Sequence, residues 1–330
     1  MTFHHILIAG AVLLAGSFAP GQAQPAPKGE NAMTSDSRTS EPFTRRSPDA
    51  PHWTIRDGLS VALHPQAIHG TDDGGPRGLI RLGLPLRPED DHPFLLNFVA
   101  VEPVTMDGRR GFSELERSPA DGRPGLRFWV DRTERHGNTL RLIIRMDKFV
   151  NGAHPFVIAT LRASRPHEVQ FQVYAEPDSA PMRMCILTAT MGNYQRLRRL
   201  HLADRVVHVN DALPQDPGPH FTPHAVFPLE QMARDRDGAI VRADSDEKDS
   251  REVSKTGKMD WFWAYLGANF VQYWRQPAPV DPDLRVVVNA RKMYWGSEIA
   301  IPGGKSYENF ELNATYRPGQ TFIYGVTPPK

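Results

Sequence analysis

Short runs in which apolar and polar residues alternate recur along the chain from about residue 55 onward. The clearest run is residues 167–176, HEVQFQVYAE. Its alternation places Val169, Phe171, Val173 and Ala175 on one face and Gln170, Gln172 and Tyr174 on the other. Residues 93–101 form a continuous apolar run, as in a strand buried on both faces. Further strand-like runs occupy residues 58–63, 126–130, 139–147, 183–190 and 205–211, with Gly, Pro, Asp and Asn between them. This pattern predicts an all-β protein, an antiparallel β-sandwich of the jelly-roll type.

Helical periodicity is weak throughout the chain. The best short candidate is residues 227–238, FPLEQMARDRDG, with Gly238 as the C-cap. Residues 231–260 mix positive and negative charges densely and contain few apolar anchors. We therefore expect one long charged surface insertion there, either a solvated excursion or a lid over a binding site.

The N-terminal part of the chain resembles an export signal followed by a linker. An apolar run from Ile6 to Gly16 precedes Gly21-Gln22-Ala23, which offers the small residues of a cleavage site. Residues 1–23 are thus expected to be a signal peptide, 24–52 a disordered Pro/Ser/Thr-rich linker, and 53–330 the folded β-sandwich domain. The expected location is secreted or periplasmic, with no membrane attachment once the leader is cleaved.

Composition narrows the classes of function. The 330 residues carry a formal net charge of +1, which gives no global electrostatic case for nucleic-acid binding. The single cysteine, Cys185, lies in an apolar run and is expected to be buried. No G-x-S-x-G, phosphate-loop, dinucleotide-binding or H-E-x-x-H motif is present. The sequence carries no signal of oligomeric state.

Candidate catalytic residues lie in the segment YWGSEIAIPGGKSYENFELNATY, residues 294–316. Gly303-Gly304 predicts a two-residue hairpin turn, with Ile301 opposite Ser306. In that register Glu298 and Glu311 are diagonal neighbours on the polar face, at a spacing that suits the paired carboxylates of a glycosidase. The same face offers Tyr294 and Tyr307 for stacking on a sugar and Asn309 for its hydroxyl groups.

The alternative interpretation of this hairpin is a half-exposed sheet face with solvated glutamates. Glu308 is unexpected in either interpretation, because on a regular strand it shares the face of Phe310 and Leu312. It would then be a partly buried carboxylate that needs a partner such as Arg291 or Lys292.

A second candidate site comes from the segment GNYQRLRRLHLADRVVHVND, residues 192–211. Arg196 and Arg198 could bind uronate carboxylates, and Tyr194, His201 or His208 could act as the base of a polysaccharide lyase. The alternative is solvated arginines and hydrogen-bonded histidines. A burst of aromatic residues at 261–274, including Trp263, exceeds what a core strand requires and suggests a surface that stacks on sugars.

Metal and cofactor signals are weak. His220 and His224 have metal-ligand spacing on a helix, but Pro223 between them argues against a helix. Residues 235–238 and 244–249 contain fragments of a calcium-loop pattern without the late bidentate glutamate, so a charged loop is favoured over a structural calcium site. We expect no cofactor.

In its leader, many strands, surplus Trp and Tyr and paired acids, the chain resembles secreted bacterial β-sandwich proteins that act on carbohydrates. The resemblance is general and assigns no catalytic residue. The leading expectation is a glycoside hydrolase using Glu298 and Glu311, with Tyr294, Tyr307, Asn309, Trp263, Arg196 and Arg198 binding the carbohydrate, which the arginines suggest is anionic. A polysaccharide lyase and a non-catalytic carbohydrate-binding or cell-surface protein are the alternatives.

Overall fold

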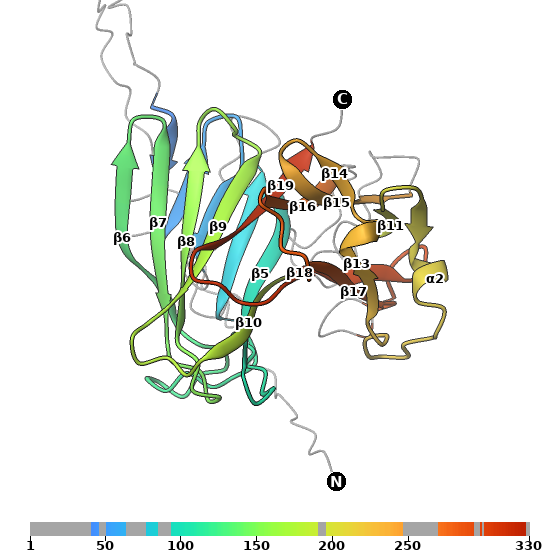
Figure 1. The fold of residues 1–330 in the computed structure, drawn as a ribbon, viewed down its shortest axis with the longest axis horizontal. Coiled ribbons are helices and arrows are strands. Elements are labelled where there is room, and N and C mark those ends of the chain that lie inside the picture. The colour runs from blue at the N-terminus through green and yellow to red at the C-terminus, as the bar shows by residue number, and fades with distance from the viewer. Residues whose placement is uncertain are drawn as a thin grey trace, which may run out of the picture. The chain divides into compact units, whose positions relative to one another are not determined.

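Two large antiparallel sheets form the protein, as the computed structural model in Figure 1 shows. The structure describes residues 41–45, 51–63, 77–84, 94–190, 196–246, 270–293, 298 and 300–327. All of them belong to the unit Ser40–Lys330. The predicted all-β sandwich is confirmed.

The nine strands of the first sheet, here sheet A, follow the order β1-β2-β3-β4-β5-β10-β18-β17-β13. Their bounds are β1 Phe43–Arg45, β2 His52–Ile55, β3 Ser60–Leu63, β4 Leu79–Leu84, β5 Phe94–Thr105, β10 Met182–Thr190, β13 Ala225–Pro228, β17 Arg285–Arg291 and β18 Ser306–Asn313.

The ten strands of the second sheet, here sheet C, follow the order β12-β11-β15-β16-β19-β9-β8-β7-β6, with β14 paired to β15. Their bounds are β6 Phe128–His136, β7 Thr139–Met146, β8 Pro155–Arg162, β9 Glu168–Ala175, β11 Leu197–His201, β12 Val206–His208, β14 Ala233–Asp235, β15 Gly238–Ser245, β16 Val271–Pro277 and β19 Gln320–Thr327. The strands β6 to β9 lie side by side in Figure 1.

One hydrophobic cluster lies between the sheets and takes residues from both of them. In β9, Val169, Phe171 and Val173 are fully buried in this cluster, as their alternation predicts. Polar contacts cross the same interior. Asn97 of sheet A donates to Gln272 of sheet C (3.1 Å), and Trp274 of sheet C donates to the Phe310 carbonyl of sheet A (2.9 Å). Buried polar groups with partners help fix how the two sheets pack.

The prediction that β18 forms a hairpin with the residues before Gly303-Gly304 is wrong. Gly303 and Gly304 do have positive φ, and the Gly304 amide bonds to the Ile301 carbonyl, so a turn forms there. However, β18 pairs with β17, placing Arg285 opposite Asn313 and Val287 opposite Glu311. The residues before the turn instead contact the end of β17, where the Ile301 amide bonds to the Lys292 carbonyl. Glu298 and Glu311 are therefore not cross-strand neighbours.

A β-bulge in β18 explains the unexpected position of Glu308. Val288 pairs with Phe310 and Ala290 with Tyr307, so β18 has one residue more than β17 in this interval. The extra residue lets both Tyr307 and Phe310 enter the core, although a regular strand would point them to opposite faces. Glu308 therefore does not share the face of Phe310.

Three other expectations about local structure are corrected. Residues 238–245, expected within a surface insertion, form the largely buried strand β15. The expected helix at 227–238 contains only the 3-10 turn η1 (Leu229–Gln231), between β13 and β14. Residues 43–45 and 52, expected within the disordered linker, belong to β1 and β2.

The helices of the described part are short. The α-helix there is α2 (Val209–Ala212), of four residues. No helix among the described residues is long and apolar enough to cross a membrane.

Candidate functional site

The outer face of sheet C carries a hollow whose lining includes six charged side chains. Because Val169, Phe171 and Val173 of β9 point into the core, Glu168, Gln170, Gln172 and Tyr174 point outward. Pairing then places Glu168 of β9, Gly325 of β19 and Tyr273 of β16 in one row, and Arg162 of β8 directly follows Leu161, the partner of Val169. Non-consecutive parts of the chain thus meet at one surface.

Two adjoining hollows of about 440 and 430 Å³ open at this row. They share Arg165, Glu168, Asp237 and Arg275. We call the combined surface the arginine groove. Its lining consists of Arg162, Arg165, Pro166, His167, Glu168, Gln170, Arg236, Asp237, Tyr273, Arg275, Pro277, Ala278, Ile323, Val326 and Thr327.

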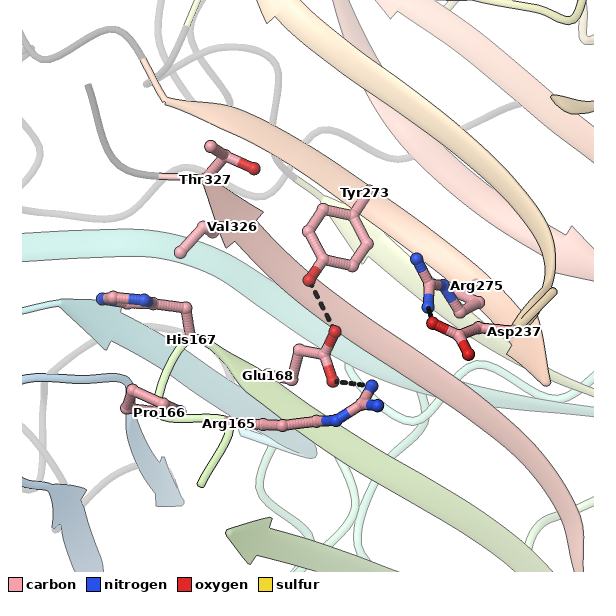
Figure 2. Close-up of a pocket in the computed structure, with 9 residues that line it drawn as sticks. All are labelled: Arg165, Pro166, His167, Glu168, Asp237, Tyr273, Arg275, Val326 and Thr327. Carbon is pink, nitrogen blue, oxygen red and sulfur yellow. Dashed lines mark hydrogen bonds and ion pairs between the residues drawn. The ribbon is translucent and has the colours of Figure 1, made fainter. Parts of the chain in front are cut away.

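Glu168 lies at the centre of the arginine groove and is held from two sides (Figure 2). The Tyr273 hydroxyl donates to Oε1 at 2.9 Å, and Nη1 of Arg165 donates to Oε2 at 3.1 Å. Burial, followed by the nearby Glu168 carboxylate, raises the pKa of Tyr273. Tyr273 therefore stays protonated and serves as a hydrogen-bond donor rather than as a base.

Gly325 makes the contact between Tyr273 and Glu168 geometrically possible. It lies between them in the row, and a Cβ atom there would be 2.2 Å from Cζ of Tyr273. The tyrosine ring therefore crosses the sheet over the bare backbone of Gly325 to reach the next strand. Glycine is required here because any side chain would collide with the Tyr273 ring, and not because the backbone angle is unusual.

Arg275 is the second fixed cation of the groove. Its Nη1 and Nη2 contact Asp237 at 3.1 Å and Asp235 at 3.3 Å, and its side chain is 10% exposed. Arg162 instead donates to the neutral amide of Gln170 at 2.9 Å. The lining contains four arginines against two carboxylates, Glu168 and Asp237, and Asp235 pairs with Arg275 from outside the lining, which leaves a formal excess of one positive charge.

Such an arrangement is suited to binding an anion. Arginine forks match carboxylates and sulfates, and Tyr273 and Gln170 add groups that can bind hydroxyls. Since Glu168 is bonded to Tyr273 and Arg165, the positions of these side chains in the groove are fixed before a ligand binds. Fixed donors lower the entropic cost of binding.

A pair of buried carboxylates lies on the outer face of sheet A. Glu102 of β5 and Glu311 of β18 flank β10, and Arg110 contacts both of them through the same nitrogen, Nη2. Their carboxylate oxygens therefore lie within roughly 6 Å of one another. Thr188 of β10 donates to Glu311 at 2.6 Å, and Asn313 donates to it at 3.2 Å.

The surroundings of Glu102 change its protonation. Burial raises the pKa of Glu102 to about 8, because the neighbouring Arg110 only partly compensates for lost hydration. Glu311 also contributes, since its charge adds to the cost of ionising Glu102. At neutral pH Glu102 is thus mostly protonated in the folded protein.

The predicted pair Glu298 and Glu311 is not brought together by strand pairing. Glu298 is exposed in the segment before the Gly303-Gly304 turn, whereas Glu311 is fully buried beside Glu102 and Arg110. Tyr307 is also buried, and its hydroxyl donates to the Val207 carbonyl at 3.2 Å. Asn309 is half-buried, with its backbone amide bonded to the Asn289 side chain.

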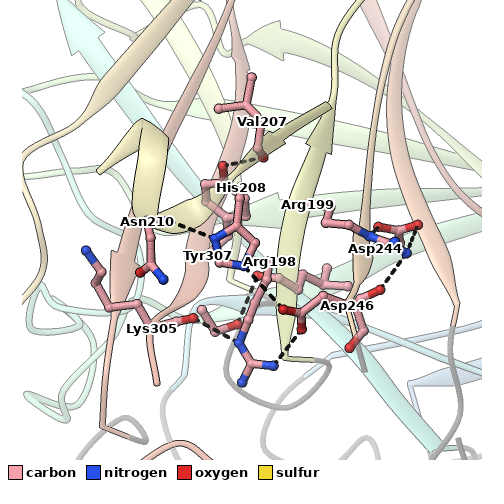
Figure 3. Close-up of polar contacts among 12 residues, drawn as sticks. Arg198, Arg199, Val207, His208, Asn210, Asp244, Asp246, Lys305 and Tyr307 are labelled. Atoms are coloured by element: carbon pink, nitrogen blue, oxygen red, sulfur yellow. Dashed lines mark hydrogen bonds and ion pairs between the residues drawn. The ribbon is translucent and has the colours of Figure 1, made fainter. Parts of the chain in front are cut away.

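Arg198 is enclosed among loop segments rather than open to solvent (Figure 3). Its guanidinium contacts Asp246 at 2.9 Å, the Lys305 carbonyl at 3.1 Å and the Pro302 carbonyl. Arg196 is buried too. His208 contacts Asp246 at 3.2 Å, so this region holds the loop before β18 against β11 and β12.

The remaining candidates give no site within the described residues. Tyr194, Trp263 and Tyr294 lie outside them. The imidazole of His224 contacts Asn289 at 3.4 Å. No group of three or more metal-ligating side chains occurs in the part of the chain that the structure describes.

Comparisons with known proteins found no match that assigns a function to these surfaces. No protein-family model matches the sequence, and no curated protein matches it.

Sequence reasoning missed both the arginine groove and Glu102. The sequence offers one signal for the groove: the alternation in residues 167–176 separates the outward side chains of this strand from the buried ones. The groove also needs Asp237 and Arg275, which reach it through β15, β16 and β19 pairing that sequence spacing does not reveal.

Proposed function

We propose that this protein binds an acidic carbohydrate, one carrying carboxylate or sulfate groups, in the arginine groove on sheet C. The observation that supports the proposal is the excess of arginines around a groove that also contains fixed hydroxyl and amide groups. Arg162 and Arg275 would contact the anionic group, while Tyr273 and Gln170 orient the sugar. The export signal expected at the N-terminus favours a secreted or periplasmic location, where such polymers occur.

Removing two of the arginines tests this proposal. The double variant Arg162→Gln/Arg275→Gln is expected to bind acidic polysaccharides at least about tenfold more weakly, because each lost charge-assisted contact is worth about 1 kcal/mol or more. Binding would be measured by calorimetry against polygalacturonate, alginate, hyaluronate and chondroitin sulfate, with starch and xyloglucan as neutral polymers.

The matched control is Arg132→Gln, which removes an exposed arginine of sheet C that pairs with Glu134 outside the groove. It should bind as the wild type does. Equal binding of acidic and neutral polymers, or of none of them, would contradict the proposal, as would unchanged affinity in a folded double variant.

Glycoside hydrolysis is a second candidate function, and its carboxylate pair would be Glu102 and Glu311. The upper limit of roughly 6 Å between their oxygens is compatible with the roughly 5–5.5 Å of retaining glycosidases, and a raised pKa on one member suits a general acid. Arg110, 27% exposed, is the member nearest solvent. A sugar would have to displace Arg110 to reach the buried carboxylates.

Reducing-end assays on the same panel of polymers test hydrolysis. Glu102→Gln and Glu311→Gln should each lower turnover by about a thousandfold or more, because the acid and its partner have separate roles. Glu134→Gln, which changes a partly exposed glutamate of β6, should have no effect. Normal turnover in either buried variant would exclude this mechanism.

A further inference from the structure

We infer that the bound carbohydrate leaves the arginine groove along the outer face of β9 and ends on a row of aromatic residues, so that the ligand is an extended chain. This inference rests on the proposed function. It adds a second binding area, on β6 to β9, to the groove, and it names the ligand as an oligosaccharide or polysaccharide rather than a single sugar.

The outer face of β9 links the two areas. From Glu168 in the arginine groove it continues through Gln170 and Gln172 to Tyr174, and all four side chains are partly exposed. The amide of Gln172 reaches the Gly319 carbonyl at 3.5 Å, and that of Gln170 accepts from Arg162. Glutamine amides bind sugar hydroxyls as both donors and acceptors.

The aromatic row crosses four strands at the far end of this path. Register places Trp129 of β6 beside Arg145 of β7, and Phe156 of β8 beside Tyr174 of β9. The rings of Phe156 and Tyr174 stack, with centroids 5.2 Å apart and planes at 15°. Arg145 lies over Phe156 at 5.2 Å, which joins the two halves of the row.

Trp129 is the most accessible ring of the row. It is 38% exposed, and Arg127 lies over it at 5.5 Å. Gly319 leaves space beside Tyr174, since a Cβ there would lie 3.1 Å from the tyrosine hydroxyl. Partly exposed aromatic rings on a sheet surface suit the apolar faces of sugar rings, while the tyrosine hydroxyl supplies a polar contact.

The length of the path sets the size of the ligand. Glu168 and Tyr174 are six residues apart on one strand, which corresponds to roughly 20 Å. A disaccharide in the arginine groove cannot also reach the aromatic row, whereas a longer chain can. Two areas joined by one ligand should bind it more tightly than either area alone.

The test compares disaccharides and hexasaccharides prepared from each acidic polymer of the panel. By calorimetry, the wild type should bind a hexasaccharide at least about tenfold more tightly than the matching disaccharide. The double variant Trp129→Ala/Tyr174→Ala should bring the hexasaccharide within about twofold of the disaccharide and leave disaccharide affinity unchanged. Gln172→Ala should weaken the hexasaccharide alone.

The matched control is Phe221→Ala, which removes an exposed aromatic that also contacts an arginine, Arg291, but lies outside sheet C. It should bind both lengths normally. Equal affinity for the two lengths, or a hexasaccharide that binds the folded double variant normally, would overturn this inference while the arginine groove stands. Failure of every acidic ligand to bind would overturn the proposed function and this inference together.

Discussion

Replacing Glu102 with glutamine is expected to abolish most of the loss of stability that the wild-type protein shows as the pH rises from about 5 to 8. Burial raises the pKa of Glu102 from 4.5 to about 8, so the folded protein keeps this proton where the unfolded chain has released it. The folded state binds more protons in that window, and the free energy of unfolding therefore falls as pH rises. The contribution is fully present below about pH 4.5 and is lost by about pH 8.

The size of this effect is on the order of 3 kcal/mol, after allowing for the coupling of Glu102 with Arg110 and Glu311. Urea unfolding at pH 5, 6.5 and 8.5 measures it. Glu102→Gln should be about as stable as the wild type at pH 5 and more stable at pH 8.5, because glutamine stays neutral. Burial also raises the pKa of Glu114, so a smaller slope should remain in the variant.

Glu134→Gln is the control for the pH measurement, because hydrogen bonding from Arg132 lowers the pKa of that partly exposed glutamate. Its titration lies below pH 5, so the slope between pH 6.5 and 8.5 should match that of the wild type. A wild-type stability that is flat or rises between pH 5 and 8.5 would rule out a protonated Glu102.

The variant Arg198→Ala should lose about 3 kcal/mol of stability, because it breaks the ion pair of a buried arginine and leaves two carbonyls without their donor. The side chain of Arg198 is 4% exposed, and that of Asp246 is 37% exposed. Gly303 allows the close packing, since a Cβ there would lie 2.7 Å from Nη2 of Arg198. Lysine should not rescue the loss, because a single ammonium group cannot replace the planar fork.

Arg199 provides the comparison for Arg198, since it is adjacent in sequence but 43% exposed and pairs with Asp244. Arg199→Ala should cost about 1 kcal/mol or less in thermal or urea unfolding. Similar small losses in both variants would show that the enclosed position of Arg198 contributes little to the fold.

The strands of this protein were predictable where one face is buried and the other is not. Residues 168–175 alternate cleanly, and in β9 Val169, Phe171 and Val173 are buried as predicted, whereas Ala175 at the end of the strand is exposed. Residues 238–245 also alternate, with Ala239, Val241 and Ala243 in the core, but the surrounding charge density concealed that signal. The dense charges around residues 238–245 therefore led to a wrong prediction of surface exposure, because β15 is buried by pairing with neighbouring strands on both sides.

Strand partners were harder to predict than strands. A Gly-Gly turn indicates a change of direction, but it does not say which earlier segment returns beside the next strand. Here Gly303 and Gly304 precede β18, while its pairing partner is residues 285–291. Glu102 and Glu311 likewise approach each other only because β5, β10 and β18 are neighbours, which residue spacing cannot indicate.

The burial of β9 has a consequence for how a polymer would be held. Val169, Phe171 and Val173 anchor this strand in the core. The outward side chains between them are therefore held at fixed positions along the strand. They recur every two residues, or about 6.6 Å, and this spacing is set by the backbone rather than by the ligand. A polymer whose repeat matches this interval would meet equivalent groups at successive units, and binding would require little further ordering of the protein.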